Sequence, residues 1–434
     1  MKKIKIIVFS VLLMFPASFL FAQSHGNSDK VPFSIGLFPP LTTNGTNAGK
    51  CINQFSLNLI SGYSAGLAGL EFAGFSNTER DFVRGTQFAG FGNFVTGEFA
   101  GFQFAGFGNF NKGISNGFQF AGFSNFNYAQ ADGVLVAGFA NFTNGKSLAI
   151  QTAGALNICE DVQGVQVSGL ANIVKGNGEA IQLSGGANIT TGEVDGVQMA
   201  GFLNFSKKQA KNVQLAGALN IVSGDVGGVQ ISGFANLASG KLNGTQIAGA
   251  LNVAREVNGL QLGFINIADT IKSGIPIGVL SIVKHGFREL ELSVGEGLNA
   301  QVAFKIGVEK FYTIFSAGTQ FLGSRDCWAY GYGIGTHLAN NDSYKLQLEA
   351  MTYHVNEGET YTDVYNDLQQ IKLLYTKKIS PHFCIFAGPA VNLLITNNRK
   401  EFRSRFAPYT IVAHHGEHTG LDGWLGITAG IHIN

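Results

Sequence analysis

The residues best suited to metal chemistry lie close together near the carboxy terminus. His414, His415 and His418 stand in a polar stretch beside Glu417, and imidazole and carboxylate groups are common zinc ligands. No predicted strand or helix fixes their spacing, so a solvated loop is the simpler interpretation. We therefore predict no metal ligand, with these three histidines as the only candidates, and we expect no cofactor.

Two other histidines have hydroxyl groups nearby in sequence. His337 follows Thr336, and His354 lies two residues after Thr352. Nucleophilic catalysis requires a nucleophile beside a base, and no recognisable motif surrounds either histidine. We therefore predict no catalytic residue and a protein that is not an enzyme. A barrel enzyme that modifies lipids is the third functional hypothesis.

Glycine-rich and basic segments have equally simple interpretations. Gly331-Tyr-Gly-Ile-Gly335 lacks the Lys-Ser/Thr of a phosphate-binding loop, and glycines within a strand explain it. Arg399, Lys400, Arg403 and Arg405 could contact anionic lipopolysaccharide, although solvated loop charge is the simpler interpretation. The formal net charge of +1 gives no reason to expect nucleic acid as a partner.

Composition describes an ordered chain that is poor in charge. Charged residues make up 13% of the 434 residues, about half the usual share of roughly 25%. The 45% of hydrophobic residues excludes disorder. The four cysteines show neither CxxC nor metal spacing, and we interpret them as isolated small hydrophobic residues: Cys51, Cys159, Cys327 and Cys384.

One unit is repeated thirteen times in the middle of the chain, mostly at intervals of 16 residues. Its consensus is G-V-Q-L-A-G-F-A-N-I-V-x-G-x-V-x, and the Asn runs from Asn77 to Asn266. The Gln six residues before it is replaced by Glu71, Leu135 and Leu260. We predict that the recurring amides form structural ladders, among them Gln87, Asn93, Gln103, Asn109, Gln198, Asn204, Gln230 and Asn236.

Two all-β architectures fit this repeat. In a parallel β-solenoid each residue stacks on its own copy, about 4.8 Å away, and a corner at the Ala-Gly pair would let Val, Leu and Phe all point inward. In the alternative, one large outer-membrane β-barrel includes the repeats as wall strands. Such a barrel has two unlike ends and predicts a 32-residue period. Because no such period is visible, the sequence favours the solenoid.

Beyond Gly286, hydrophobic and polar residues alternate with the period of a strand. Leu290 and Leu292 face one side of the first segment, and Glu289 and Glu291 face the other. About eight such strands predict a C-terminal antiparallel β-barrel-like domain, with a soluble β-sandwich as the alternative. The predicted strands are 288–294, 299–307, 310–321, 327–338, 344–350, 367–378, 382–395 and 422–433.

The amino terminus has the features of an export signal. Basic residues precede an apolar run from Ile6 to Phe21, and Ala22 provides a small residue at its end. We therefore predict a signal peptide over 1–22, a linker over 23–52, the repeat array over 53–285 and the β-domain over 286–434.

Two repeats, Gly196-Val-Gln-Met-Ala-Gly-Phe-Leu-Asn204 and Gly228-Val-Gln-Ile-Ser-Gly-Phe-Ala-Asn236, resemble those of exported surface-repeat proteins of Gram-negative, Bacteroidota-like bacteria, whose function is unknown. The resemblance implies an envelope protein and brings no catalytic residue. We expect a non-enzymatic structural or interaction protein at the outer membrane or cell surface of a Gram-negative bacterium. Its expected partners are outer-membrane lipid, envelope components or other surface proteins. Passive transport through an outer-membrane pore is the alternative.

Overall fold

The chain is all-β, with a β-solenoid of about 14 turns at roughly 16-residue spacing and a closed eight-stranded antiparallel barrel at the carboxy terminus. This computed structural model describes residues 29–322, 326–358, 361, 364–397, 406–416 and 418–433. It confirms the solenoid and excludes the alternative in which the repeats are wall strands of one large barrel. The predicted signal peptide over 1–22 lies outside the described residues. The chain divides into two compact units, Met1–Ala129 and Gln130–Asn434.

The first unit begins with a strand where we predicted a linker. β1 (Asp29–Phe38) pairs in parallel with β3 (Cys51–Asn58), so the segment belongs to the sheet. Between them lie β2 (Leu41–Thr42), antiparallel to β1, and the 3-10 helix η2 (Gly45–Lys50). Residues 29–50 are therefore structured rather than a linker, since β1 pairs with backbone groups of β3 that would otherwise form an open sheet edge.

Each complete coil has a long strand, a sharp corner at the Ala-Gly pair and a short returning strand. Where the polar turn is extended, the short strand runs on into the next long strand and the two are counted as one, as in β5 and β12. The remaining strands of the first unit are β4 (Ser64–Ala73), β5 (Ser76–Ala89), β6 (Gly92–Val95), β7 (Glu98–Ala105), β8 (Gly108–Asn111), β9 (Ser115–Ala121) and β10 (Ser124–Asn127).

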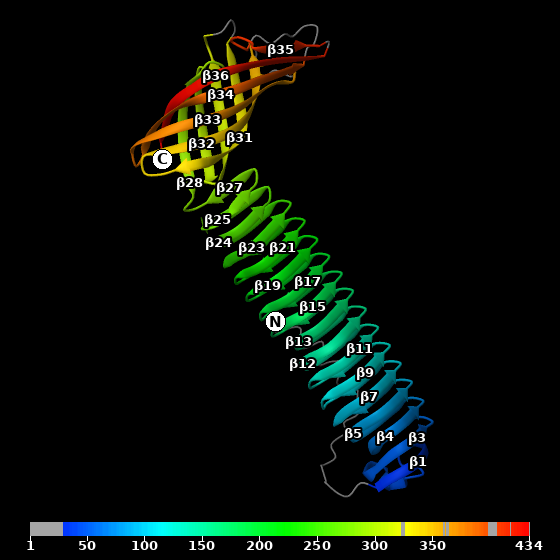
Figure 1. Ribbon diagram of the computed structural model, residues 1–434. Coiled ribbons are helices and arrows are strands. Elements are labelled where there is room, and N and C mark those ends of the chain that lie inside the picture. The colour runs from blue at the N-terminus through cyan, green and yellow to red at the C-terminus, as the bar shows by residue number, and fades with distance from the viewer. Residues whose placement is uncertain are drawn as a thin grey trace. The chain divides into compact units, whose positions relative to one another are not determined.

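The second unit continues the same coil design before its barrel (Figure 1). Its solenoid strands are β11 (Ala131–Ala137), β12 (Ala140–Ala153), β13 (Leu156–Ser168), β14 (Ala171–Val174), β15 (Gly178–Ser184), β16 (Ala187–Thr190), β17 (Val194–Ala200), β18 (Leu203–Ser206), β19 (Ala210–Ala216), β20 (Leu219–Val222), β21 (Val226–Ser232), β22 (Ala235–Ala238), β23 (Lys241–Ala248), β24 (Leu251–Leu262), β25 (Ile265–Ile271), β26 (Ile275–Ile277) and β27 (Leu280–Val283).

Parallel pairing places like residues over like residues. In the long strands Gln182 pairs with Gln198 and Gln198 with Gln214, and in the short strands Asn188 pairs with Asn204. The corner requires glycine, because a Cβ at Gly201 would lie 2.1 Å from the carbonyl oxygen of the glycine one coil earlier. The repeat period is therefore the period of the stacked coils.

The direction of the apolar side chains differs from our expectation. Val197, Met199 and Phe202 point away from the coil interior, and the side chains of Phe202 and Met199 are 58% and 42% exposed. Gln198 and Asn204 are fully buried instead. The prediction that Val, Leu and Phe all point inward is wrong. Successive side chains of a strand point to opposite faces, so when Gln198 points inward, Val197 and Met199 must point outward. The stacked amides can then form hydrogen bonds with one another inside the coil.

The barrel is formed by antiparallel neighbours in chain order, and it is closed by β28 against β36, where Leu290 pairs with Ile433. A short strand, β35 (Val412–His415), pairs with the beginning of β36. The eight barrel strands are β28 (Phe287–Gly295), β29 (Ala300–Val308), β30 (Phe311–Gln320), β31 (Cys327–Asn340), β32 (Tyr344–Glu357), β33 (Asn366–Ser380), β34 (Phe383–Asn397) and β36 (Thr419–Ile433). Among the described residues, no helix has the length and apolar character needed to span a membrane.

Candidate functional site

A network of charged side chains fills the middle of the barrel. Lys305 on β29 is completely buried, and its Nζ lies 2.6 Å from a carboxylate oxygen of Glu291 and 3.8 Å from one of Glu289. The same ammonium also contacts Glu349 on β32. Tyr312 donates a hydrogen bond of 3.0 Å from its hydroxyl to Glu349. One buried lysine thus joins carboxylates from strands that are not all neighbours in the barrel.

Further cations balance these carboxylates. Lys345 Nζ lies 2.9 Å from Glu289, and Lys372 Nζ lies 3.8 Å from both Glu291 and Glu349. His432 places Nδ1 3.2 Å from Glu289 and Nε2 3.0 Å from Glu291. Three buried lysines therefore face three buried glutamates, a pairing that burial of charge requires.

Glycines on β31 make room for large side chains in the lumen. A Cβ at Gly335 would lie 2.3 Å from the Tyr312 ring, and one at Gly331 would lie 2.5 Å from the Tyr353 ring. Both tyrosines are almost completely buried. The segment 331–335 is therefore part of a barrel strand, and its glycines serve packing. The interior of this barrel is filled by side chains, as is common with eight strands.

The outer face of the barrel has the opposite character. Leu292 and Ile427 are 42% and 64% exposed, whereas Glu291 is 1% exposed. The pattern repeats around the barrel, where the exposed apolar residues include Leu290, Val294, Val302, Phe304, Phe315, Ile334, Leu348, Ile371, Leu373, Ile385, Val391, Leu393, Leu425 and Ile433. The barrel is thus polar inside and apolar outside.

Amphipathic aromatic residues gather outside the barrel around His354. The ring centroids of Tyr330 and Tyr361 lie 5.7 Å and 5.5 Å from that of His354, and the centroid of Trp328 lies 5.8 Å from that of Tyr330. His354 Nδ1 lies 2.9 Å from a carboxylate oxygen of Asp367. This histidine is therefore oriented by a carboxylate, on the outward face of β32. Tyrosine and tryptophan with one polar end suit a membrane interface.

Inside the solenoid the asparagines form a directional ladder. Asn204 donates from Nδ2 to Oδ1 of Asn220 at 2.9 Å, and to the backbone oxygen of Leu215 at 2.7 Å. The predicted ladder residues Asn93 and Asn236 donate in the same direction, to the asparagines 16 residues later. Each asparagine therefore joins two coils through both its side chain and the backbone.

The glutamines form a second ladder, which runs the other way. Gln198 donates from Nε2 to Oε1 of Gln182, and Gln230 donates to Gln214, each at 2.7 Å. The predicted pair Gln103 and Gln87 is joined likewise at 3.0 Å. The treatment of Leu260 as a replacement for this glutamine is wrong. Gln261 occupies the column and donates to Gln246, because the corner between Leu262 and Ile265 is one residue shorter and brings the Gln one residue closer to the Asn.

Two buried carboxyl groups lie beside these ladders in the first unit, Glu71 in the glutamine column and Glu79 two residues after the repeat Asn, in register with Val95. Glu71 stands in the glutamine column and accepts a hydrogen bond of 3.1 Å from Gln87 Nε2, while Glu79 accepts another from the same nitrogen. Both side chains are buried. Desolvation by burial, followed by the charge of Glu71, raises the pKa of the Glu79 carboxyl well above its usual value. Gln87 therefore holds two carboxyl groups together inside the coil.

The metal candidates do not converge. His414 and His415 are exposed neighbours in β35 and so point to opposite faces, and His415 Nε2 lies 3.1 Å from Asp422. His418 is also exposed. Among the described residues no three His, Cys, Asp or Glu side chains form a group suited to a metal ion. Arg399, Lys400, Arg403 and Arg405 lie outside the described residues.

His337 and the cysteines are parts of packed interiors. His337 Nε2 lies 3.2 Å from Gln347 Nε2, and its ring packs edge-on against Phe287. All four cysteines are buried, and none forms a disulfide. Burial raises the pKa of the Cys159 thiol to about 12, so it stays protonated. The charge network of the barrel was missed as a set, because only the closed barrel brings Lys305 to Glu349.

Comparisons with protein-family models, curated proteins and solved structures found no match to this chain.

Proposed function

We propose that this chain is an exported, non-enzymatic outer-membrane protein, in which the barrel is a lipid-embedded anchor and the array is a structural or interaction module. The observation that carries the proposal is the polarity of the barrel. Leu292 is exposed while its neighbour Glu291 is buried, and the same alternation recurs on the other strands. A barrel in water would expose the carboxylates and bury the leucines.

The membrane accounts for both faces of the barrel. A structure in lipid must satisfy its backbone polar groups internally, which a closed barrel does, and outer-membrane barrels present an apolar band outside and polar residues inside. The aromatic residues around His354, with their polar ends, would lie at one border of that band. The predicted export signal and the resemblance to Gram-negative surface-repeat proteins agree with this location.

The filled lumen favours an anchor over a pore. Lys305, Lys372, Tyr312 and Tyr353 occupy the barrel interior and are almost completely buried. An ion crossing this lumen would have to break the pairs between Lys305 and its carboxylates. Passive transport is therefore the weaker hypothesis, and we expect planar bilayers with the purified protein to show no conductance above background.

Membrane integration can be measured on the mature chain. We expect the purified protein to fold into phosphatidylethanolamine–phosphatidylglycerol vesicles, to float with them, to resist extraction by alkaline carbonate, and to migrate differently in gels before and after boiling. Leu292→Arg places a charge on the outward face and should slow or abolish insertion, since Arg or Lys on the lipid face costs about 2–4 kcal/mol at mid-bilayer. Lys310→Glu, at an exposed turn position, is the matched control. A wild-type chain that stays soluble and monodisperse without detergent or lipid would contradict the proposal.

A further inference from the structure

The coils of the solenoid are apolar outside and polar inside over one half of their circumference. In the coil that contains β17 and β18, Gln198 and Asn204 are buried, while Phe202 is 58% exposed. Three further coils present only apolar or glycine residues at the equivalent outward positions, from Ile181 to Ile189, from Val213 to Ile221 and from Val229 to Leu237. Soluble monomers rarely leave large contiguous apolar patches uncovered.

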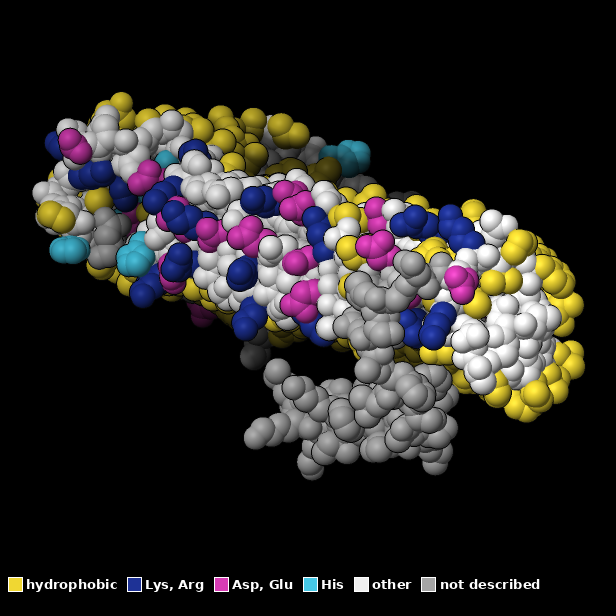
Figure 2. Space-filling view, turned by 90° about the horizontal axis from the view of Figure 1, so that it is seen from below, with side chains coloured by type: hydrophobic (Ala, Val, Ile, Leu, Met, Phe, Trp, Pro, Cys, Tyr) yellow, Lys and Arg dark blue, Asp and Glu magenta, His cyan; other side chains and the backbone are white. Residues whose placement is uncertain are grey.

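Charge is confined to the other half of every coil. We define the apolar tip as the nine residues from seven before the repeat Asn to one after it. In the thirteen copies the tips contain one ionisable residue, Glu71, and its side chain is buried. The remaining half, here called the base, carries residues such as Asp195, Lys207 and Lys208, all exposed. In Figure 2 the charged side chains gather in a band, with hydrophobic side chains at its margins.

The tip leaves little backbone for water to satisfy. Gly201 N–H donates to the backbone oxygen of Ser184, and Phe202 N–H donates to that of Gly186, so even the corner is hydrogen-bonded to the preceding coil. The amides of Gln198 and Asn204 are used within the ladders. A surface with its backbone paired and its outward side chains apolar meets the condition for contact with hydrocarbon. A protein partner would ordinarily find about one hydrogen bond per 100–200 Å² of interface.

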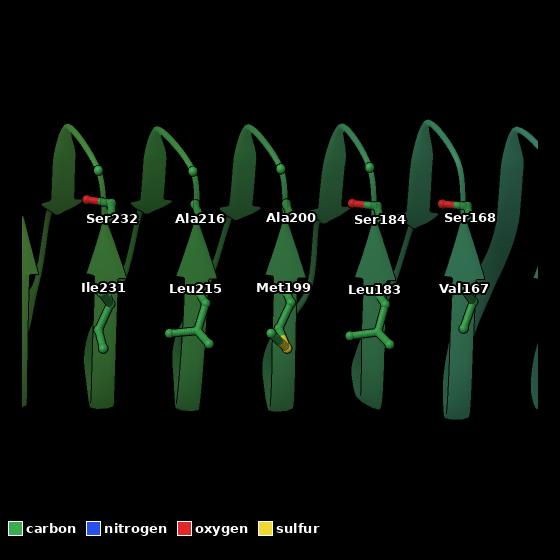
Figure 3. Close-up of a pocket in the computed structure, with 14 residues that line it drawn as sticks. Val167, Ser168, Leu183, Ser184, Met199, Ala200, Leu215, Ala216, Ile231 and Ser232 are labelled. Atoms are coloured by element: carbon green, nitrogen blue, oxygen red, sulfur yellow. The ribbon is translucent and has the colours of Figure 1, made fainter.

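A groove follows the corner of five successive coils. Its walls are the outward residues Val167, Leu183, Met199, Leu215 and Ile231, and its floor is made of alanine, serine and glycine (Figure 3). The hydroxyls of its serines Ser168, Ser184 and Ser232 are buried, so they are not offered to an occupant. The groove is therefore an apolar hollow within the tip surface, of a kind that flexible hydrocarbon chains can fill.

The depth of the tip selects the occupant. About four to five residues separate the corner from the first charged position, and at ~3.3 Å per residue this is roughly 15 Å. One leaflet of a bilayer has half of the ~30 Å hydrocarbon thickness. We propose that the apolar tips of the array are immersed in one leaflet of a phospholipid bilayer, with the charged base at the headgroups. This proposal does not depend on the barrel being the anchor.

The test measures the depth of spin labels on the full mature chain in vesicles of phosphatidylethanolamine and phosphatidylglycerol. Single labels are attached at Phe202→Cys in the tip and at Lys207→Cys in the base of the same coil. The native cysteines are buried, so the unmutated chain is the labelling blank. A label at Leu292→Cys reports separately whether the barrel has inserted.

We expect the label at position 202 to collide with dissolved oxygen more often than with a water-soluble nickel chelate, and the label at 207 to show the reverse. A label at 202 that collides freely with the nickel chelate would overturn the proposal. So would a label shielded from both reagents together with crosslinked dimers, since a second copy would then cover the tip. If either result occurs while the label at position 292 still collides with oxygen, the barrel is inserted, and the proposal that it is a membrane anchor remains supported. Circular dichroism of each variant verifies that the array is folded.

Discussion

Asn204 and Asn220 lie 16 residues apart and are joined by a hydrogen bond of 2.9 Å between Nδ2 and Oδ1, in an interior with no exposed side-chain surface at either residue. The bond is possible because the residues occupy the same place in successive coils. The interior of the solenoid is therefore held by identical residues that satisfy one another. A polar core of this kind costs little as long as every member has a partner.

Breaking the ladder at one residue should destabilise the array. Asn204→Leu removes hydrogen bonds to Asn220, Leu215 and Gln198 and leaves neighbouring amides without partners. We expect a loss of about 3 kcal/mol, given about 1 kcal/mol per hydrogen bond and 1–3 kcal/mol for each unsatisfied group. Hydrogen exchange of the array in vesicles measures it. Asn116→Leu, at an exposed position of the base, should leave exchange rates nearly unchanged.

The sequence predicted the stacking and the ladders better than the direction of the side chains. The constant spacing of residues such as Asn188 and Asn204 can be read directly from the sequence, and it indicates that each copy forms one coil. Whether Gln198 or Met199 faces inward depends on what surrounds the protein. Reasoning from apolar burial alone placed Val, Leu and Phe inside, and it did not weigh that stacked amides such as Gln198 and Gln182 satisfy one another in the interior.

The corner glycines should tolerate no side chain. A Cβ at Gly201 would lie 2.1 Å from the backbone oxygen of Gly185, and the neighbouring coils repeat this contact, so the strands would have to separate. Gly201→Ala should therefore lower stability by several kcal/mol, as overpacking against backbone does. Gly227→Ala is the matched control, because nothing lies within 4 Å of its added Cβ. If the two variants unfold at the same urea concentration, the claim that the corner has no room for a side chain is wrong.

Glu79 should make the stability of the first unit depend on pH. Burial and the charge of Glu71 raise its pKa in the folded state above the ordinary value of 4.5. The contribution to stability is therefore fully present below about pH 4.5 and is lost as the pH rises through the folded-state pKa. Glu79→Gln cannot ionise, so it should be more stable than the wild type at pH 8 and give a flatter profile.

Urea unfolding of residues in the first unit, measured from pH 4 to pH 8, tests this prediction. Glu98→Gln, at an exposed position, should keep the wild-type profile. A Glu79→Gln variant that loses stability at pH 8 would mean that the ionised carboxylate is stabilised by Gln87 more than it is penalised by burial.

Lys305 should be the most sensitive charge in the barrel. Lys305→Met leaves Glu289, Glu291 and Glu349 with fewer partners in the lumen, and loss of one member of a buried ion pair costs about 3–5 kcal/mol. When samples are heated before electrophoresis, we expect the folded band of Lys305→Met to disappear at a lower temperature than that of the wild type. Lys310→Met, at an exposed turn, should behave as the wild type. Unchanged heat resistance of Lys305→Met would show that the network is dispensable.

Seven of the eight barrel strands were predicted to within three residues at each end, because the alternation of apolar and polar residues, such as Leu290 and Glu291, can be read from the sequence in any register. The eighth prediction, 344–350, was too short, since β32 continues to Glu357. The charge network was not. Lys305 and Glu349 are 44 residues apart, and no local pattern pairs them until the eight strands close. The candidate histidines show the converse, since His414 and His415 are adjacent in sequence and therefore lie on opposite faces of one strand.

The outward face of the barrel offers the most direct measurement of the central claim, that lipid surrounds it. Trp328 is 40% exposed on that face, and Trp424 is 2% exposed inside. In a Trp424→Phe chain folded into vesicles, bromine placed on the lipid chains should quench the fluorescence of Trp328, and water-soluble iodide should quench it less. In a Trp328→Phe chain, Trp424 should respond to neither quencher. Quenching of Trp328 by iodide alone, with no effect of brominated lipid, would contradict a barrel embedded in a membrane.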